Sequence, residues 1–137
     1  MLHRATCVAL AGRAILIEGA PGSGKSSLAL ALIDRGAVLI GDDGVTLEER
    51  SGQLFASPPP NIAGLLEVRN LGLLEFPVSS DVRVALIVAL DEHAPRFIEG
   101  AELTERAGVM LPLVRLWPSG TAPAQKAELA LARYGLT

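Results

Sequence analysis

The amino-acid sequence predicts an α/β fold with a mainly β core, one helix near the N-terminus and a second helix at the C-terminus. Three observations carry this prediction. The motif G-x-x-x-x-G-K-[ST] occupies residues 19–26, between an apolar run of strand length and a helix-forming segment. Other short apolar runs are bounded by Gly, Pro, Asn or Asp, as strands commonly are. Residues 122–134 are rich in Ala, Leu and Glu and precede Gly135, which is typical of a helix.

The first half of the chain is expected to hold a hairpin, a helix and further strands. Strands 6–10 and 14–18 flank a tight turn, so they should pair as a hairpin. A helix over 27–35 follows the motif, and Gly36 suits the residue after its last turn. Further strands are predicted at residues 37–40, 45–48 and 54–56, before a stiff loop of three prolines at 58–60.

The second half contains the clearest strand, residues 82–90, which is apolar enough to be covered on both faces. A polar loop is predicted over 91–100. Residues 102–107 are interpreted as a single helical turn, and residues 109–117 as one or two strands around Pro112. Composition shows no linker, so residues 1–137 are expected to form a single domain.

Composition and charge exclude several classes of function. The net charge is −3 and no long basic run occurs, so a nucleic-acid partner is not expected. Cys7 is the only cysteine, which excludes an intramolecular disulfide and a Cys-rich zinc site. No apolar run approaches the roughly 20 residues of a membrane span, and no signal-peptide pattern opens the chain. We therefore expect a soluble, cytoplasmic protein that does not engage a membrane.

The motif at residues 19–26 is the phosphate-binding P-loop. Glycines let several backbone N–H groups turn toward one anion, and the following helix adds the positive end of its dipole. Lys25 is expected to reach the β- and γ-phosphates of ATP, and the Ser26 hydroxyl to hold Mg²⁺. The predicted nucleotide-binding residues are Gly19, Ala20, Pro21, Gly22, Ser23, Gly24, Lys25, Ser26 and Ser27.

Two acids, Asp42 and Asp43, end the apolar run that follows the first helix. A P-loop enzyme places there the carboxylates that bind Mg²⁺ and orient a water or hydroxyl. The alternative is a polar Asp-Gly turn that joins two strands of a hairpin, and the two interpretations are compatible.

Glu67 and Arg69 lie two residues apart among aliphatic residues and would share a face on a strand. The pair is open to two interpretations: a buried ion pair, or a carboxylate for Mg²⁺ beside a guanidinium for a transferring phosphoryl group. Spacing alone does not decide between them.

The chain resembles the catalytic domain of HPr kinase/phosphorylase, the bacterial enzyme that phosphorylates a serine of the phosphocarrier HPr. It is most similar to the short form that lacks an N-terminal domain. The resemblance rests on the P-loop, on the Asp-Asp pair, and on residues 65–72, L-L-E-V-R-N-L-G, which are similar to the family signature L-L-E-[IV]-R-G-L-G.

The resemblance implies a role for each matching residue. Lys25 corresponds to the phosphate-binding lysine, and Ser26, Asp42 and Glu67 to groups that hold Mg²⁺. One of the two aspartates is implied to act as base toward the substrate serine, and Asp43 is favoured. The other implied catalytic residues are His3, Arg69 and Arg96, with Arg96 in a loop that is shortened here. The family also implies ATP as donor, an HPr-like partner and a homo-oligomer, a hexamer by resemblance.

The sequence departs from the family at two places. Asn70 replaces the usual glycine of the signature, and Asn tolerates positive φ better than most residues. Residues 116–121, L-W-P-S-G-T, stand where the family typically has P-V-R-P-G-R, a segment linked to dephosphorylation. Because both arginines are missing, we expect a better kinase than phosphorylase. Two other functions remain open: a small-molecule kinase or NTP hydrolase, and a nucleotide-binding regulator without catalysis.

Overall fold

The computed structural model describes residues 1–61 and 63–137. The two helices are α1 (Lys25–Asp34) and α2 (Pro123–Tyr134). The strands are β1 (Leu2–His3), β2 (Thr6–Leu10), β3 (Arg13–Gly19), β4 (Val38–Gly41), β5 (Val45–Arg50), β6 (Gln53–Ser57), β7 (Leu65–Val68), β8 (Gly72–Glu75), β9 (Val82–Leu90), β10 (Glu102–Arg106) and β11 (Val109–Leu116).

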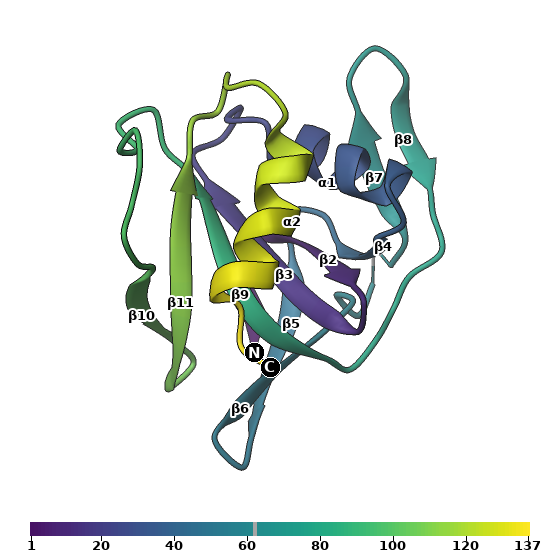
Figure 1. Cartoon of the computed structure of the whole chain (residues 1–137). Coiled ribbons are helices and arrows are strands. Elements are labelled where there is room, and N and C mark those ends of the chain that lie inside the picture. Colours follow the sequence, from purple (N-terminus) through teal and green to yellow (C-terminus); the bar gives the residue numbers. More distant parts are fainter. Residues whose placement is uncertain (62) are drawn as a thin grey trace.

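A mixed sheet forms the body of the molecule (Figure 1), in the order β1-β5-β6-β9-β3-β2-β4, with β10 joined to β11 and β11 to β9. Strand β9 is its centre. It runs parallel to β3 on one side, and on the other side it pairs first with β6 and then, over its last four residues, with β11. The β7–β8 hairpin forms a small sheet of its own. This mainly β core with two helices confirms the predicted fold class.

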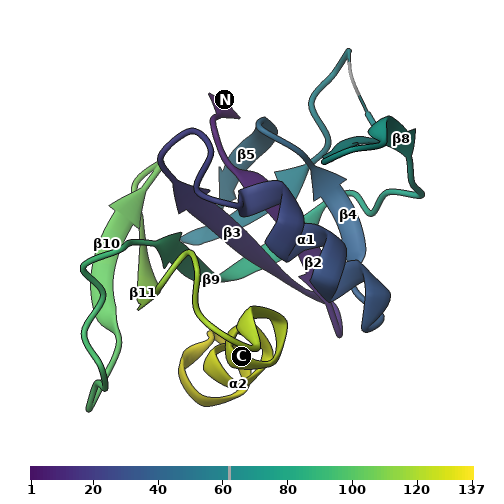
Figure 2. The same cartoon turned by 90° about the horizontal axis from the view of Figure 1, so that it is seen from above.

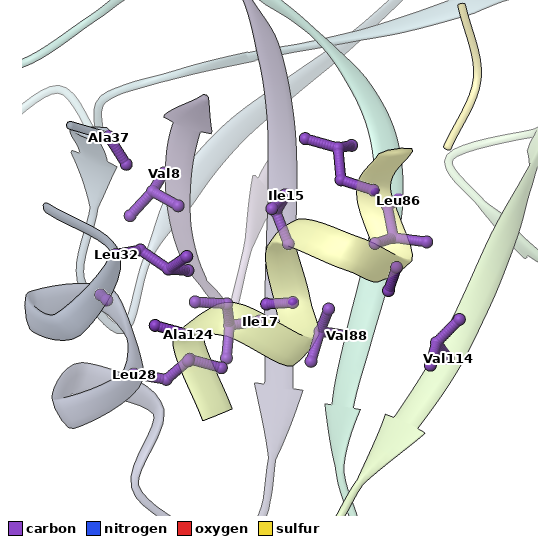
Figure 3. Close-up of a cluster of buried hydrophobic side chains, with 14 of the residues drawn as sticks. Val8, Ile15, Ile17, Leu28, Leu32, Ala37, Leu86, Val88, Val114 and Ala124 are labelled. Carbon is purple, nitrogen blue, oxygen red and sulfur yellow. The ribbon is translucent and has the colours of Figure 1, made fainter. Parts of the chain in front are cut away.

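Both faces of the central strands are covered, which explains their nearly continuous apolar sequence. In β3, Ile15 and Ile17 belong to a cluster beneath the helices, whereas Leu16 belongs to a second cluster on the opposite face. Figure 3 shows the first cluster, in which Leu28 and Leu32 of α1 pack with residues of β2, β3 and β9. The apolar runs therefore follow from burial on two sides.

Helices α1 and α2 lie on the same face of the sheet and contact each other. Figure 2 shows α2 nearly end-on, below the strands of the sheet, and α2 contacts β9 and β11. An ion pair between Arg35 and Glu128, with N–O distances of 2.9 and 3.0 Å, links the two helices at the surface. Neither α1 nor α2, nor any other helix within the described ranges, has the length and hydropathy needed to span a bilayer.

The prediction of a helical turn at residues 102–107 is wrong. Residues Glu102–Arg106 form β10, which pairs antiparallel with β11 through a two-residue turn at Ala107-Gly108. Both turn residues have positive φ, 50° and 83°, as a type I′ hairpin turn requires. The sequence did not predict this turn because its first position holds alanine, where Asn, Asp or Gly is usual.

The alternative interpretation of the Asp-Gly segment, a hairpin that joins residues 37–40 to residues 45–48, is also wrong. Both segments are strands, but β4 pairs with β2, and β5 pairs with β1 and β6. The Asp-Gly segment therefore connects two different parts of the sheet. The first helix begins at Lys25 instead of residue 27, and residues 109–116 form one continuous strand through Pro112.

Candidate functional site

Four strands end at the same edge of the sheet, and each leads into a segment that the sequence analysis singled out. Strands β3, β9 and β11 are mutually parallel, and β4 runs in the same direction because both β3 and β4 are antiparallel to β2. The P-loop follows β3, Asp42 and Asp43 follow β4, and the loops 91–101 and 117–122 follow β9 and β11. Polar groups from distant parts of the sequence meet there, as ligand sites of parallel strands do.

The P-loop is shaped to receive an anion. Gly22 and Gly24 have φ of 79° and 103°, and Gly24 is the residue that precedes α1. In the described part of the chain, no side chain caps this helix end, and no acidic residue lies in its first turn. The first-turn N–H groups therefore keep their hydrogen-bonding capacity for a ligand. The buried hydroxyl oxygen of Ser23 has no partner among the described residues, which fits a loop that completes its contacts with a bound group.

Lys25 lies across the P-loop. Its ammonium group donates hydrogen bonds to the carbonyl oxygens of Gly19 and Ala20, at 3.0 and 3.3 Å. These are contacts with the loop itself, so the side chain can exchange them for phosphate oxygens without disturbing the core. The Lys25 ammonium group thus lies against the backbone of the P-loop, and its predicted contact with phosphates stays a prediction.

Asp42 is held by three donors from three separate elements. The hydroxyl groups of Ser26 and Thr6 donate to Oδ1 at 2.7 and 3.0 Å, and the backbone N–H of Glu67 donates to Oδ2 at 3.0 Å. The Thr6 residue is fully buried. Three hydrogen bonds fix the carboxylate against the start of α1.

Thr6 is one residue of the candidate site that the sequence did not single out. It is the first residue of β2, which lies between the strands that carry the P-loop and the aspartates. Its hydroxyl also accepts a hydrogen bond from the backbone N–H of Asp43, at 3.3 Å. The only signal in the sequence is a polar residue at the end of an otherwise apolar strand, and that signal is too common to be decisive.

Asp43 points away from its neighbour. Its backbone φ is 57°, and its side chain is 66% exposed, whereas Asp42 is half-buried. Its nearest cation is Arg4, at 3.5 Å, whose side chain is itself 83% exposed. Such a surface pair is screened by water and leaves the Asp43 carboxylate open to an incoming group.

The Glu67 and Arg69 side chains are both exposed, so the alternative of a buried ion pair is wrong. Glu67 lies on β7, and its backbone contacts Asp42, but Arg69 lies in the turn between β7 and β8 instead of on the strand. Asn70 in that turn has φ of 73°, the positive value expected for a position where the family signature has glycine.

His3 lies next to the start of the P-loop, within a small charged cluster. Its Nε2 is 2.8 Å from Glu18, the residue before Gly19, and Arg106 of β10 binds the same carboxylate with distances of 2.7 and 3.0 Å. Burial raises the pKa of Glu18, but the hydrogen bonds and charges of Arg106 and His3 outweigh it and hold that pKa below its ordinary value. Glu18 and Arg106 are further residues of this site that sequence reasoning missed.

Arg96 lies on the other side of the P-loop, in the loop that follows β9. It is exposed and borders a cavity together with Trp117 and Lys126. The structure therefore brings Lys25, Ser26 and the aspartates together, places His3 and Glu67 beside them, and leaves Arg69 and Arg96 on loops at opposite ends of the site.

The oxygens of Ser26 and Asp42 are of the kinds that Mg²⁺ prefers. Within residues 1–61 and 63–137, no group of three His, Cys, Asp or Glu side chains is arranged to hold a metal ion. One carboxylate and one hydroxyl, from Asp42 and Ser26, fit Mg²⁺, which usually keeps several waters and takes one or two protein carboxylates together with phosphate oxygens.

Comparison with known sequences decides the family. The model of the family described as "HPr Serine kinase C-terminal domain" matches residues 1–99. The chain belongs to this family. All the site residues that the sequence predicts, from His3 to Arg96, lie within the matched region, whereas Arg106, Trp117 and α2 lie beyond it.

Individual members of the HPr serine kinase family match over shorter stretches. The HPr kinase/phosphorylase of Clostridium tetani is 48% identical over 66 residues, which cover 48% of this chain and 22% of the relative. The enzyme of Lacticaseibacillus casei is 37% identical over 92 residues, which cover 61% and 29% respectively. The matched part of the chain thus spans between a fifth and a third of these relatives.

A solved structure shares the fold over almost the entire chain. The structure of the Hpr(Ser) kinase/phosphatase from Coxiella burnetii superposes with a TM-score of 0.84 at 23% sequence identity, covering 96% of this chain and 94% of that one. The fold of the HPr serine kinase family therefore extends through β10, β11 and α2, beyond the residues that the family model matches.

Proposed function

We propose that residues 1–137 act as the catalytic domain of an ATP-dependent protein serine kinase whose substrate is an HPr-like phosphocarrier. The relatives bear the name HPr kinase/phosphorylase, and the family match supports the same activity here. The main support is the hydrogen bond from the Ser26 hydroxyl to Asp42 Oδ1, at 2.7 Å, which links the end of the P-loop to the residue after β4. It joins a phosphate-binding loop to a carboxylate held in place by hydrogen bonds, with a second, exposed carboxylate beside it.

The phosphates of ATP are bound by the backbone of the P-loop and the start of α1. Lys25 leaves the carbonyl oxygens of Gly19 and Ala20 and turns its ammonium group to the phosphates. The residues that hold Mg²⁺ are Ser26 and Asp42, with Glu67 near enough through its strand to contribute. Bound Mg²⁺ neutralises phosphate charge and orients the transferred group.

Asp43 is the proposed base. Its exposed carboxylate accepts the proton of the substrate serine while the hydroxyl oxygen attacks the terminal phosphorus. Asp42 is poorly suited to this role, because its oxygens already accept three hydrogen bonds. Arg69 and Arg96, on loops at the two ends of the site, supply positive charge to the transferring phosphoryl group. We propose that His3, whose ring is held by Glu18, is a catalytic residue beside the P-loop.

A protein substrate is favoured by the surface next to Asp42. Leu71, Leu73 and Leu74 of the β7–β8 hairpin are 70%, 65% and 37% exposed, on the element whose backbone contacts Asp42. Large exposed apolar side chains that gather on one element commonly mark a protein-binding surface. We propose that this hairpin contacts the phosphocarrier. We also propose that the chain forms a homo-oligomer, a hexamer by family resemblance.

The test is incubation with Mg²⁺, ATP labelled in its terminal phosphoryl group, and HPr, followed by location of the label. We expect label on a serine of HPr, no label on HPr with that serine replaced by alanine, and loss of transfer in Lys25→Ala. Arg133→Ala, which removes a cation from the surface of α2, serves as the control. Label released without HPr would instead indicate a small-molecule kinase or hydrolase, and nucleotide binding without turnover would indicate a regulator.

A further inference from the structure

A cavity lies at the edge of the sheet beside the P-loop, in a part of the molecule that the proposed mechanism uses only through Arg96. It has a volume of about 180 Å³ and lies between the loop after β9, the end of β11 and the start of α2. Its walls include Ala94, Arg96, Phe97, Leu116, Trp117 and Lys126. Pockets that enclose a whole small ligand usually measure about 300–1,000 Å³, so this one suits part of a larger molecule.

The sheet fixes the position of the cavity relative to the P-loop. Gly19, which opens the P-loop, pairs with Leu90 of β9, and Leu90 pairs in turn with Leu116 of β11. These three residues end their strands side by side, so the P-loop and the cavity wall are two strand spacings apart, about 10 Å. The cavity also opens on the helix-covered face, because Val114 and α2 contribute to both the cavity and the helix-side cluster.

Trp117 presents a fixed aromatic surface in this cavity. Its indole Nε1 donates a hydrogen bond to the carbonyl oxygen of Ala94 at 2.7 Å, which ties the ring to the loop after β9. The residue remains 44% exposed, and a second hollow lies on the same side chain. An aromatic ring that is both held in orientation and accessible is the kind of surface on which a nucleic-acid base stacks.

The charges around the cavity favour an anionic ligand. Arg96 and Lys126 border it, and none of the described residues that line it is acidic. Arg115 also borders it, but Glu102 and Asp91 bind its guanidinium group at 2.7–3.1 Å, so its charge is already compensated. The two remaining cations suit a molecule that combines a flat ring with phosphate groups.

We propose that this cavity receives the base and ribose of the nucleotide whose phosphates lie in the P-loop, with the base stacked on Trp117. The inference rests on the proposed function, because it assumes that the P-loop binds the phosphates. It assigns a binding role to Trp117 and Phe97, of which only Phe97 lies within the residues that match the family model. A free anionic metabolite is the competing occupant, and the experiment separates the two.

Trp117 is the only tryptophan of the chain, so tryptophan emission reports on the surroundings of this one side chain. The full chain is titrated with ATP and Mg²⁺, and separately with inorganic tripolyphosphate and Mg²⁺, while binding is followed by calorimetry and by tryptophan emission. We expect ATP to quench or shift the emission. Tripolyphosphate should bind without changing it, since that ligand has no base.

Variants test the stacking independently of fluorescence. Trp117→Leu keeps an apolar side chain but removes the ring. Given the strength of base–aromatic stacking, it should lower the affinity for ATP about tenfold. The affinity for tripolyphosphate should not change. Trp117→Phe should keep most of the affinity. Leu129→Ala, a change of an exposed residue of α2 outside the cavity, is the matched control.

Each other outcome overturns the inference in a different way. If ATP binds but neither the emission nor the Trp117→Leu affinity changes, the base lies elsewhere and the P-loop assignment stands. If tripolyphosphate changes the emission as much as ATP does, the cavity receives an anion and not a base. If neither ligand binds, the proposed function and the subsite both fail.

Discussion

At the scale of single residues, Asp42 and Asp43 show how the backbone separates two identical side chains. The positive φ of Asp43 turns its carboxylate outward, whereas Asp42 faces the buried hydroxyl of Thr6 and the first turn of α1. One carboxylate is therefore immobilised and the other is free. Adjacent sequence positions thus acquire different chemistry without any difference in residue type.

This difference predicts two distinct phenotypes. Asp43→Asn should bind ATP and Mg²⁺ normally but lose turnover by about 10²–10⁴-fold, the usual contribution of a general base. Asp42→Asn should weaken nucleotide binding as well as turnover, because it disturbs Ser26 and Thr6. Calorimetry and single-turnover transfer measure the two effects, with Asp34→Asn on the exposed end of α1 as control. Full turnover in both aspartate variants would mean that the pair is only a connecting segment.

Glu18 predicts a pH-dependent contribution to stability. Its pKa in the folded chain lies below the ordinary value of 4.5, because the bonds from Arg106 and His3 outweigh the effect of burial. The ionised form therefore stabilises the folded state above that ordinary pKa, and this contribution disappears as the pH falls through the lowered value. Near neutral pH, Glu18→Gln should cost about 1 kcal/mol, the low end for a charged hydrogen bond that is partly exposed.

Urea unfolding of the parent and of Glu18→Gln between neutral pH and pH below about 4 tests the prediction. The difference in unfolding free energy should shrink as the solution becomes more acidic. Glu99→Gln, a change of an exposed carboxylate in the loop after β9, controls for the general effect of net charge. A difference that stayed constant with pH would show that the cluster acts through packing instead of ionisation.

At the scale of elements, the sequence predicted what short-range patterns encode. Alternating or continuous apolar runs located β2, β3, β9 and β11, and the P-loop located α1. The sequence could not predict that β4 and β5 pair with distant strands, because the Asp-Gly segment between them resembles a hairpin turn. For the same reason the contact of Thr6 with Asp42 and of Arg106 with Glu18 was hidden: each pair meets only after the sheet has assembled.

The hairpin between β10 and β11 offers a direct test of its turn. Ala107 has φ of 50°, a conformation that costs an L-residue about 1–2 kcal/mol relative to right-handed backbone. Ala107→Gly and Ala107→Asn should therefore raise stability by about 0.5–1 kcal/mol, and Ala107→Val should lower it by more than that. Thermal or urea unfolding measures the change, with Ala101→Gly, just before β10, as control. Destabilisation by both Gly and Asn would contradict the positive φ.

At the scale of the whole molecule, the topology gathers one site from several separate segments. Parallel β3, β4, β9 and β11 all end at one edge, so the P-loop, the aspartates and the walls of the cavity meet although Gly19 and Trp117 are 98 positions apart in the sequence. The same topology brings the β7–β8 hairpin to Asp42. The sequence could identify these segments one by one, but only the strand order shows that the P-loop lies between the aspartates and the cavity.

The distribution of charge over this edge predicts the balance between forward and reverse reactions. Dephosphorylation by inorganic phosphate brings two anions together, and their repulsion has to be offset by fixed positive charge. Residues 116–121 contain no arginine, and the neighbouring Arg115 is bound by Glu102 and Asp91. We therefore expect the forward rate with ATP to exceed, by at least about tenfold, the rate of pyrophosphate release from phosphoserine-HPr with Mg²⁺ and phosphate.

Thr121→Arg should reduce this difference in rate by returning a guanidinium group to the segment, whereas Thr137→Arg adds the same charge elsewhere and should not. Equal forward and reverse rates in the parent chain would contradict the prediction and would mean that Arg96 or a neighbouring subunit supplies the charge.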